Sequence, residues 1–151
     1  MTDTTAPRSP RRTAPTWFWV TAAAGLAWNL FGAVQFLGSL SATPESLQAQ
    51  GLTAEQASVM LGYPGWMTAA FAVGVGGGVL GCLLLLARNA YAGPVFAASL
   101  AGYIILYIGD ITEGVFAALG APQVIILTIV VLIAAGLLLV SRDAARKGIL
   151  A

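Results

Sequence analysis

The 151-residue sequence contains no histidine and a single cysteine, Cys82. Without histidine, the chain has no His-based catalytic triad, no imidazole general base and no imidazole metal ligand. One cysteine allows no intramolecular disulfide, and alone it is too few for a structural zinc site. We therefore expect no enzyme, no metal and no other cofactor, and we interpret Cys82 as an inert packing residue in an apolar helix.

Charged residues are also scarce, at 9% of the chain, whereas 58% of the residues are hydrophobic. A soluble domain carries roughly 25% charged residues. This deficit is too large for a surface that faces water, so the composition predicts an integral membrane protein whose main partner is the lipid bilayer. The net charge of +1 gives no indication of a nucleic-acid partner.

Four apolar segments are long enough to cross a bilayer as helices. They cover residues 17–40, 65–87, 91–109 and 122–140. The first is longer than the apolar core of a signal peptide, which has about 7–15 residues, so we expect it to be retained. The predicted fold is an all-α, four-helix transmembrane bundle over residues 17–141. A disordered cytoplasmic tail at 1–16 and a basic cytoplasmic tail at 142–151 would flank it.

The distribution of charge predicts the orientation. With four spans, all Lys and Arg residues fall on one side of the membrane, at positions 8, 11, 12, 88, 142, 146 and 147. In the connections on the opposite side every charged residue is acidic, and these residues are Glu45, Glu55, Asp110 and Glu113. The positive-inside rule then puts both termini in the cytoplasm, with the chain in a bacterial inner membrane.

Two connections contain further signals. Thr43-Pro44-Glu45 and Thr53 to Gln56 are typical helix starts, and predict two short helices at the membrane surface in the first outer loop. The third helix either stops at Asp110 or continues as far as Leu119, and the sequence leaves both alternatives open. Gly120-Ala121-Pro122 breaks the chain in either case.

The second span is rich in glycine. Its GGGVLG string fits the dinucleotide-binding pattern G-x-G-x-x-G, but it lies in the middle of an apolar helix without a preceding strand, which excludes that function. Small residues instead allow a second helix to approach closely. We therefore assign Gly74, Gly77, Gly78 and Gly81 to helix packing, either within one chain or between two copies.

Two groups of polar and aromatic residues are candidates for a solute site. In the first span, Trp28, Asn29 and Gln35 share one side of the helix, which we expect to face the bundle interior. In the third span a stripe runs toward the outer end, formed by Ser99, Tyr103, Tyr107 and Asp110, with Glu113 one turn beyond. Aromatic rings beside carboxylates suit a polyhydroxylated solute, and two nearby carboxylates can share a proton. The alternative is that these residues make helix–helix hydrogen bonds and interfacial contacts.

Several strings together resemble a family of small bacterial four-helix inner-membrane proteins that are often labelled sugar transporters. The strings are Trp28-Asn29-Leu30 with Gly32 and Phe36; Pro64 and Trp66 with Ala69-Ala70-Phe71-Ala72; the glycine run with Leu83 to Arg88; Tyr91-Ala92; and Arg142 to Leu150. The chain departs from that pattern at Gly148-Ile149-Leu150, where an aromatic residue is expected after the glycine. The chain also resembles, more weakly, a family of four-helix, oxidase-associated membrane proteins. It lacks the acidic residue that is expected in the second span of that family.

Two functions follow as hypotheses. In the first, the chain binds or transports a small, sugar-like polar solute. Because four short helices enclose little volume, it would work as a homodimer packed through the glycine stripe formed by Gly74, Gly77, Gly78 and Gly81. In the second, it is a non-catalytic membrane subunit or scaffold that binds a larger protein complex or lipid.

Overall fold

The fold is known from a computed structural model that describes residues 12–151. This part of the chain is mostly helical and contains no strand. The four long helices are α1 (Thr16–Leu40), α4 (Gly65–Leu86), α5 (Ala92–Thr112) and α7 (Ala121–Arg146). The three short ones are α2 (Pro44–Ala49), α3 (Ala54–Leu61) and α6 (Val115–Leu119). Most of the predicted N-terminal tail, including Arg8 and Arg11, lies outside the described residues.

Each long helix is long and apolar enough to cross a membrane. This confirms the prediction of an all-α chain with four candidate membrane spans. A bilayer offers the backbone no hydrogen-bond partners, so a spanning segment satisfies its own amides as a helix even where glycine is frequent. The glycine-rich segment accordingly forms the uninterrupted helix α4.

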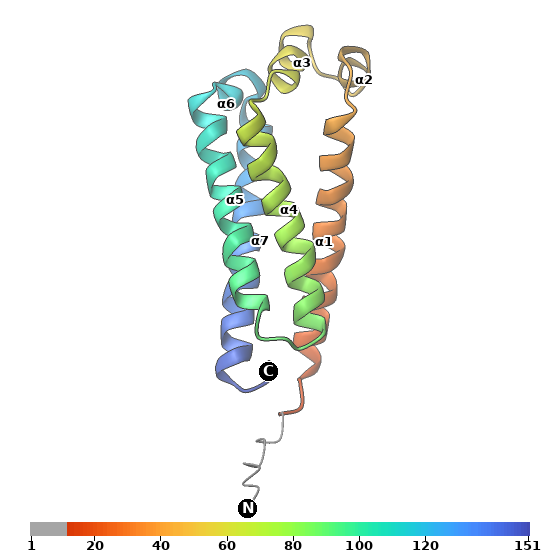
Figure 1. The fold of residues 1–151 in the computed structure, drawn as a ribbon. Helices are drawn as coiled ribbons and strands as arrows, with labels where there is room; N and C mark the ends of the chain where they lie inside the picture. The colour runs from red at the N-terminus through yellow and green to blue at the C-terminus, as the bar shows by residue number, and fades with distance from the viewer. Residues whose placement is uncertain (1–11) are drawn as a thin grey trace, which may run out of the picture.

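The long helices pack in the spatial order α1, α4, α5, α7 (Figure 1). One end of the bundle carries the first described residues, the α4–α5 turn and Ala151, and we call it the terminal end. The other, which carries α2, α3 and α6, we call the loop end. At the terminal end α1 reaches α7, where Phe18 and Leu137 share one apolar cluster. Toward the loop end α1 leans away from the other long helices (Figure 1), although the rings of Phe36 on α1 and Phe71 on α4 still meet edge to face.

The short helices α2 and α3 begin where the sequence predicted. The Thr43 side chain accepts a hydrogen bond from the Ser46 amide, and the Ser46 hydroxyl oxygen accepts one from the Thr43 amide. Thr53 and Gln56 form the same reciprocal cap on α3. These caps satisfy amides that lack partners in the first turn of a helix.

The third span ends in a way that neither sequence alternative described. Helix α5 continues past Asp110 to Thr112, and the chain then turns through Gly114, whose φ of +74° favours glycine. The next five residues form the separate helix α6 rather than an extension of α5. Gly120, also at φ +74°, turns the chain into α7. The two glycines therefore fold this connection over the loop end.

The last residues of the chain pack against the terminal end. Helix α7 continues to Arg146, beyond the apolar run, and Ile149 and Leu150 then turn back and are buried in the cluster that contains Phe18. The Arg88 guanidinium donates to the Ile149 carbonyl at 3.0 Å, and the backbone of Ala151 pairs with that of the α4–α5 turn. The segment predicted as a basic tail is thus partly helical and partly buried.

Candidate functional site

Asp110 has the least expected environment of any charged residue in the structure. It lies in the last turn of α5, at the loop end, and its side chain is fully buried. Its carboxylate accepts hydrogen bonds from the Tyr63 hydroxyl and the Gln123 side-chain amide, each at 3.0 Å. Within residues 12–151 the only ion pair is Lys147–Asp143, near the opposite end, so no cation neutralises Asp110. Burying a carboxylate without a positive partner is costly.

Three separate segments bring these groups together. Tyr63 precedes α4 on its connection from α3, Asp110 lies in the last turn of α5, and Gln123 lies in the first turn of α7. The approach is close because α5 has glycine at 109, where a Cβ atom would lie only 2.7 Å from the Trp66 ring. Burial, together with the nearby Asp110 carboxylate, raises the pKa of Tyr63 above its ordinary value. Tyr63 is therefore a neutral hydrogen-bond donor across the physiological pH range.

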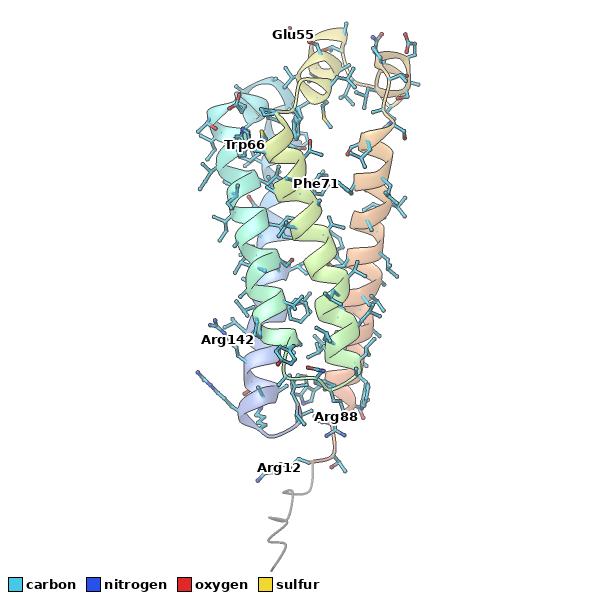
Figure 2. All side chains as sticks on the ribbon, viewed as in Figure 1. Arg12, Glu55, Trp66, Phe71, Arg88 and Arg142 are labelled. Atoms are coloured by element: carbon cyan, nitrogen blue, oxygen red, sulfur yellow. The ribbon has the colours of Figure 1, made fainter. Side chains whose placement is uncertain are left out.

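Aromatic side chains lie at the same end of the bundle as Asp110. The rings of Tyr107 and Phe116 meet edge to face, with centroids 5.0 Å apart. The Tyr107 hydroxyl lies 3.3 Å from the Thr128 hydroxyl oxygen, and Thr128 itself donates to the Val124 carbonyl, so Tyr107 is the donor. Trp66 is half-exposed at the same end of α4 (Figure 2). The loop end thus combines a buried acid with hydroxyl groups and ring faces.

Glu113 does not join Asp110. It follows the last residue of α5, and its side chain is exposed, whereas that of Asp110 is buried. The structure therefore provides one buried carboxylate at this end, and not the expected pair that shares a proton.

Ser99 and Tyr103, the next members of the predicted stripe, are both buried between α5 and α4. The Ser99 hydroxyl donates to the Gly74 carbonyl at 2.5 Å, and the Tyr103 ring packs against Gly74, where a Cβ atom would lie 2.7 Å from the ring. Gly77 receives the Cβ of Ser99, and Gly81 receives the ring of Phe96. These residues therefore bring α4 and α5 into close contact.

Gly78 faces the other neighbour, α1. The Asn29 side-chain oxygen lies against Gly78, in the space that a Cβ atom would occupy. The amide nitrogen of Asn29 donates to the Gly25 carbonyl at 2.8 Å and to the Cys82 sulfur at 3.8 Å. All four predicted packing glycines thus contact helices of the same chain, and a second copy would need a different surface.

The expected polar wall on α1 is not formed. Asn29 is buried, but Trp28 and Gln35 point away from the other helices and are exposed. Between α1 and α4 lies a hollow of about 350 Å³, with Phe36, Val75 and Leu80 among its apolar walls. The polar candidates of α1 and α5 therefore do not line one common cavity.

Sequence reasoning missed three contributors to the site, namely Tyr63, Gln123 and Thr128. Tyr63 has the position of an interfacial anchor, which is the usual role of Tyr at the end of a span. Gln123 and Thr128 lie in the most apolar of the four segments. A search for donors that could satisfy a buried Asp110 would have pointed to Gln123, because it is the one amide side chain near that end of the fourth span.

In chemical terms the site is a carboxylate held by two neutral donors. Such a group can take up a proton, after which it needs fewer donors and must itself donate to one of its partners. In comparisons with known proteins, no family model matches the chain, and no curated protein or solved structure matches it.

Proposed function

We propose that the chain is a small multi-pass protein of the bacterial inner membrane that transports a small polar solute, with Asp110 as its proton-binding group. The fully buried Asp110 carboxylate, which has only neutral partners, is the observation that carries this proposal. An ionisable side chain within a membrane span is costly, and such residues commonly serve proton or ion pathways. A bound proton would supply the positive charge that no side chain supplies.

The orientation proposed for the chain follows from its charges. Arg12, Arg88 and Arg142 lie toward the terminal end, and Glu55 lies at the loop end (Figure 2). The positive-inside rule then makes the terminal end cytoplasmic and the loop end external. In this orientation α2 and α3 lie at the outer membrane surface, and Asp110 is the first buried acid that a proton from outside would meet.

The three-way hydrogen bonding of Asp110 suggests how a proton could act on the fold. The ionised carboxylate ties the α3–α4 connection and α7 to α5 through Tyr63 and Gln123. Protonation converts one acceptor oxygen into a donor, so one of these two bonds must rearrange or break. The outer ends of α5 and α7 would then separate more easily, and a passage for solute would open beside Tyr107.

The aromatic surroundings favour a polyhydroxylated solute over a lipid-like one. Ring faces such as those of Tyr107 and Phe116 stack on the apolar faces of sugars, while hydroxyl and carboxylate oxygens accept hydrogen bonds from sugar hydroxyls. The sequence resemblance to proteins labelled sugar transporters points to the same solute class.

The test is uptake by the purified protein in sealed vesicles. A panel of labelled sugars and polyols is offered with an imposed inward proton gradient, and the expected result is gradient-dependent uptake of at least one of them. Asp110→Asn should abolish uptake because it keeps the shape but cannot bind the proton. The matched control is Asp143→Asn, an acid paired with Lys147 at the terminal end, which should leave uptake unchanged. Equal uptake by the wild-type and Asp110→Asn proteins would refute the role of Asp110.

A second function is favoured by a separate observation, the loose packing of α1. Helix α1 packs mainly on α4, and its Trp28 and Gln35 side chains are exposed. An amide side chain facing lipid is costly unless it finds a hydrogen-bond partner. In this alternative, a membrane helix of a larger protein packs on α1 and bonds to Gln35, and the chain is a non-catalytic subunit. This alternative would be favoured if the wild-type protein copurified with one partner in a fixed ratio and took up no solute. The Gln35→Leu protein should then lose the partner.

A further inference from the structure

A second hollow lies at the terminal end, far from Asp110. It has a volume of about 290 Å³ and opens between the first turns of α5 and the last turns of α7. Gly93, Pro94 and Ala97 line it from α5, and Ser141, Arg142 and Ala145 line it from α7. The space exists because the lining residues other than Arg142 have small side chains, and a Cβ atom on Gly93 would meet only the Ser141 hydroxyl, at 3.7 Å.

The rim of this hollow carries one positive charge. Arg142 is exposed at the side of α7 and points away from the bundle (Figure 2). The neighbouring acid, Asp143, is already paired with Lys147 at 2.6 Å. Within residues 12–151 there is no other ion pair, so the Arg142 guanidinium has no carboxylate partner in that range. The Ser141 hydroxyl is buried and donates to the Leu138 carbonyl, so it adds no charge to the site.

We propose that this hollow binds one anionic phospholipid, with the lipid phosphate on Arg142 and the start of an acyl chain against Gly93, Pro94 and Ala97. Arg142 comes two residues after the end of the apolar run of α7, which places its guanidinium at the level of the lipid headgroups. A guanidinium matches the geometry of a phosphate and can bind it through two parallel hydrogen bonds. Basic pockets between membrane helices on the cytoplasmic side are suited to anionic lipid headgroups.

The size and the polarity of the hollow agree with this occupant. Its volume is just below the roughly 300–1,000 Å³ that is usual for ligand pockets, so it fits a headgroup and a short length of chain. Small apolar side chains form the floor of the hollow, and the charged Arg142 lies at its rim. A phospholipid has the matching arrangement, because its apolar acyl chains and its charged phosphate are both attached to the glycerol. A soluble anion would leave the apolar floor uncovered.

The test is native mass spectrometry of the full chain released from micelles that contain phosphatidylglycerol and phosphatidylcholine in equal amounts. We expect the protein to retain one phosphatidylglycerol in preference to phosphatidylcholine. Arg142→Gln should weaken this retention about fivefold, the effect of one basic residue on an anionic lipid. The matched control is Arg146→Gln, which removes the same charge one turn further along α7, outside the hollow, and should have little effect.

A second variant tests the hollow without changing the charge. Ala145→Leu fills the space from an exposed position of α7 and should also weaken retention of phosphatidylglycerol. Equal losses in Arg142→Gln and Arg146→Gln would overturn the proposal, because they indicate diffuse attraction to a basic end. Undiminished retention by Ala145→Leu would overturn it as well. Competition by soluble glycerol phosphate as strong as that by the intact lipid would identify a simple anion site instead.

Discussion

Replacing Gly78 with alanine tests the contact between α1 and α4 most sharply. The added methyl group would occupy the position of the Asn29 side-chain oxygen. Asn29 must then rotate away, which breaks its hydrogen bonds to the Gly25 carbonyl and the Cys82 sulfur, or α1 must move off α4. Gly76 offers a matched control on the same helix, because a Cβ atom there meets nothing within 4 Å.

The expected cost can be worked out from these contacts. Overfilling a packed interior costs about 1–3 kcal/mol, and hydrogen bonds between membrane helices contribute about 0.6 kcal/mol each. Alanine in place of glycine returns up to about 1 kcal/mol through helix propensity. We therefore expect Gly78→Ala to lower the free energy of unfolding by about 1–3 kcal/mol. Gly76→Ala should leave it unchanged or raise it.

The assay is reversible unfolding in detergent micelles by added dodecyl sulfate, followed by far-ultraviolet circular dichroism. A double-mutant cycle with Asn29→Ala isolates the contact, because the clash disappears when the amide is removed. Gly78→Ala should then cost at least about 1 kcal/mol less in the Asn29→Ala background than in the wild type. Equal costs in both backgrounds, or a Gly78→Ala protein as stable as Gly76→Ala, would refute the packing described for α1 and α4.

Three further outcomes are expected. Gly74→Ala should destabilise the fold by about 1–3 kcal/mol because its methyl group meets the Tyr103 ring, and a Tyr103→Ala background should relieve most of that loss in the same unfolding assay. Leu150→Asp puts a charge into the apolar cluster around Phe18, so limited proteolysis should cut the end of the chain faster than in Leu150→Ala. Because the folded state raises the pKa of Tyr63, the contribution of this residue to stability should be constant well below about pH 10, the pKa of an unfolded tyrosine, and should be lost as the pH rises above that value. The thermal stability of Tyr63→Phe should therefore fall less at high pH than that of the wild type.

The four long apolar helices could be predicted because length and hydropathy decide whether a segment suits a bilayer. The turn after the third span could not, because Gly114 is compatible with a continuing helix as well as with the positive φ it adopts. The caps at Thr43 and Thr53 are local interactions between residues three apart, so the sequence alone was sufficient to find them.

The candidate site was only partly predictable because its contacts join distant segments. Asp110 stood out as an acid within a helical pattern, but its donors Tyr63 and Gln123 are 47 residues before it and 13 residues after it. On α1, the row that contains Asn29 and the row that contains Gln35 lie side by side on the helix. Helix spacing could not decide which row meets α4, and only the packing of the bundle turns Gln35 outward.

The most direct test of the central claim measures proton entry and solute entry together in the same vesicles. A pH-sensitive dye inside the vesicles reports the protons, and the labelled sugar or polyol reports the solute. Wild-type and Asp143→Asn proteins should carry both, whereas Asp110→Asn should carry neither while its circular dichroism remains that of the folded protein. Solute-linked proton entry that persists in folded Asp110→Asn would contradict the account.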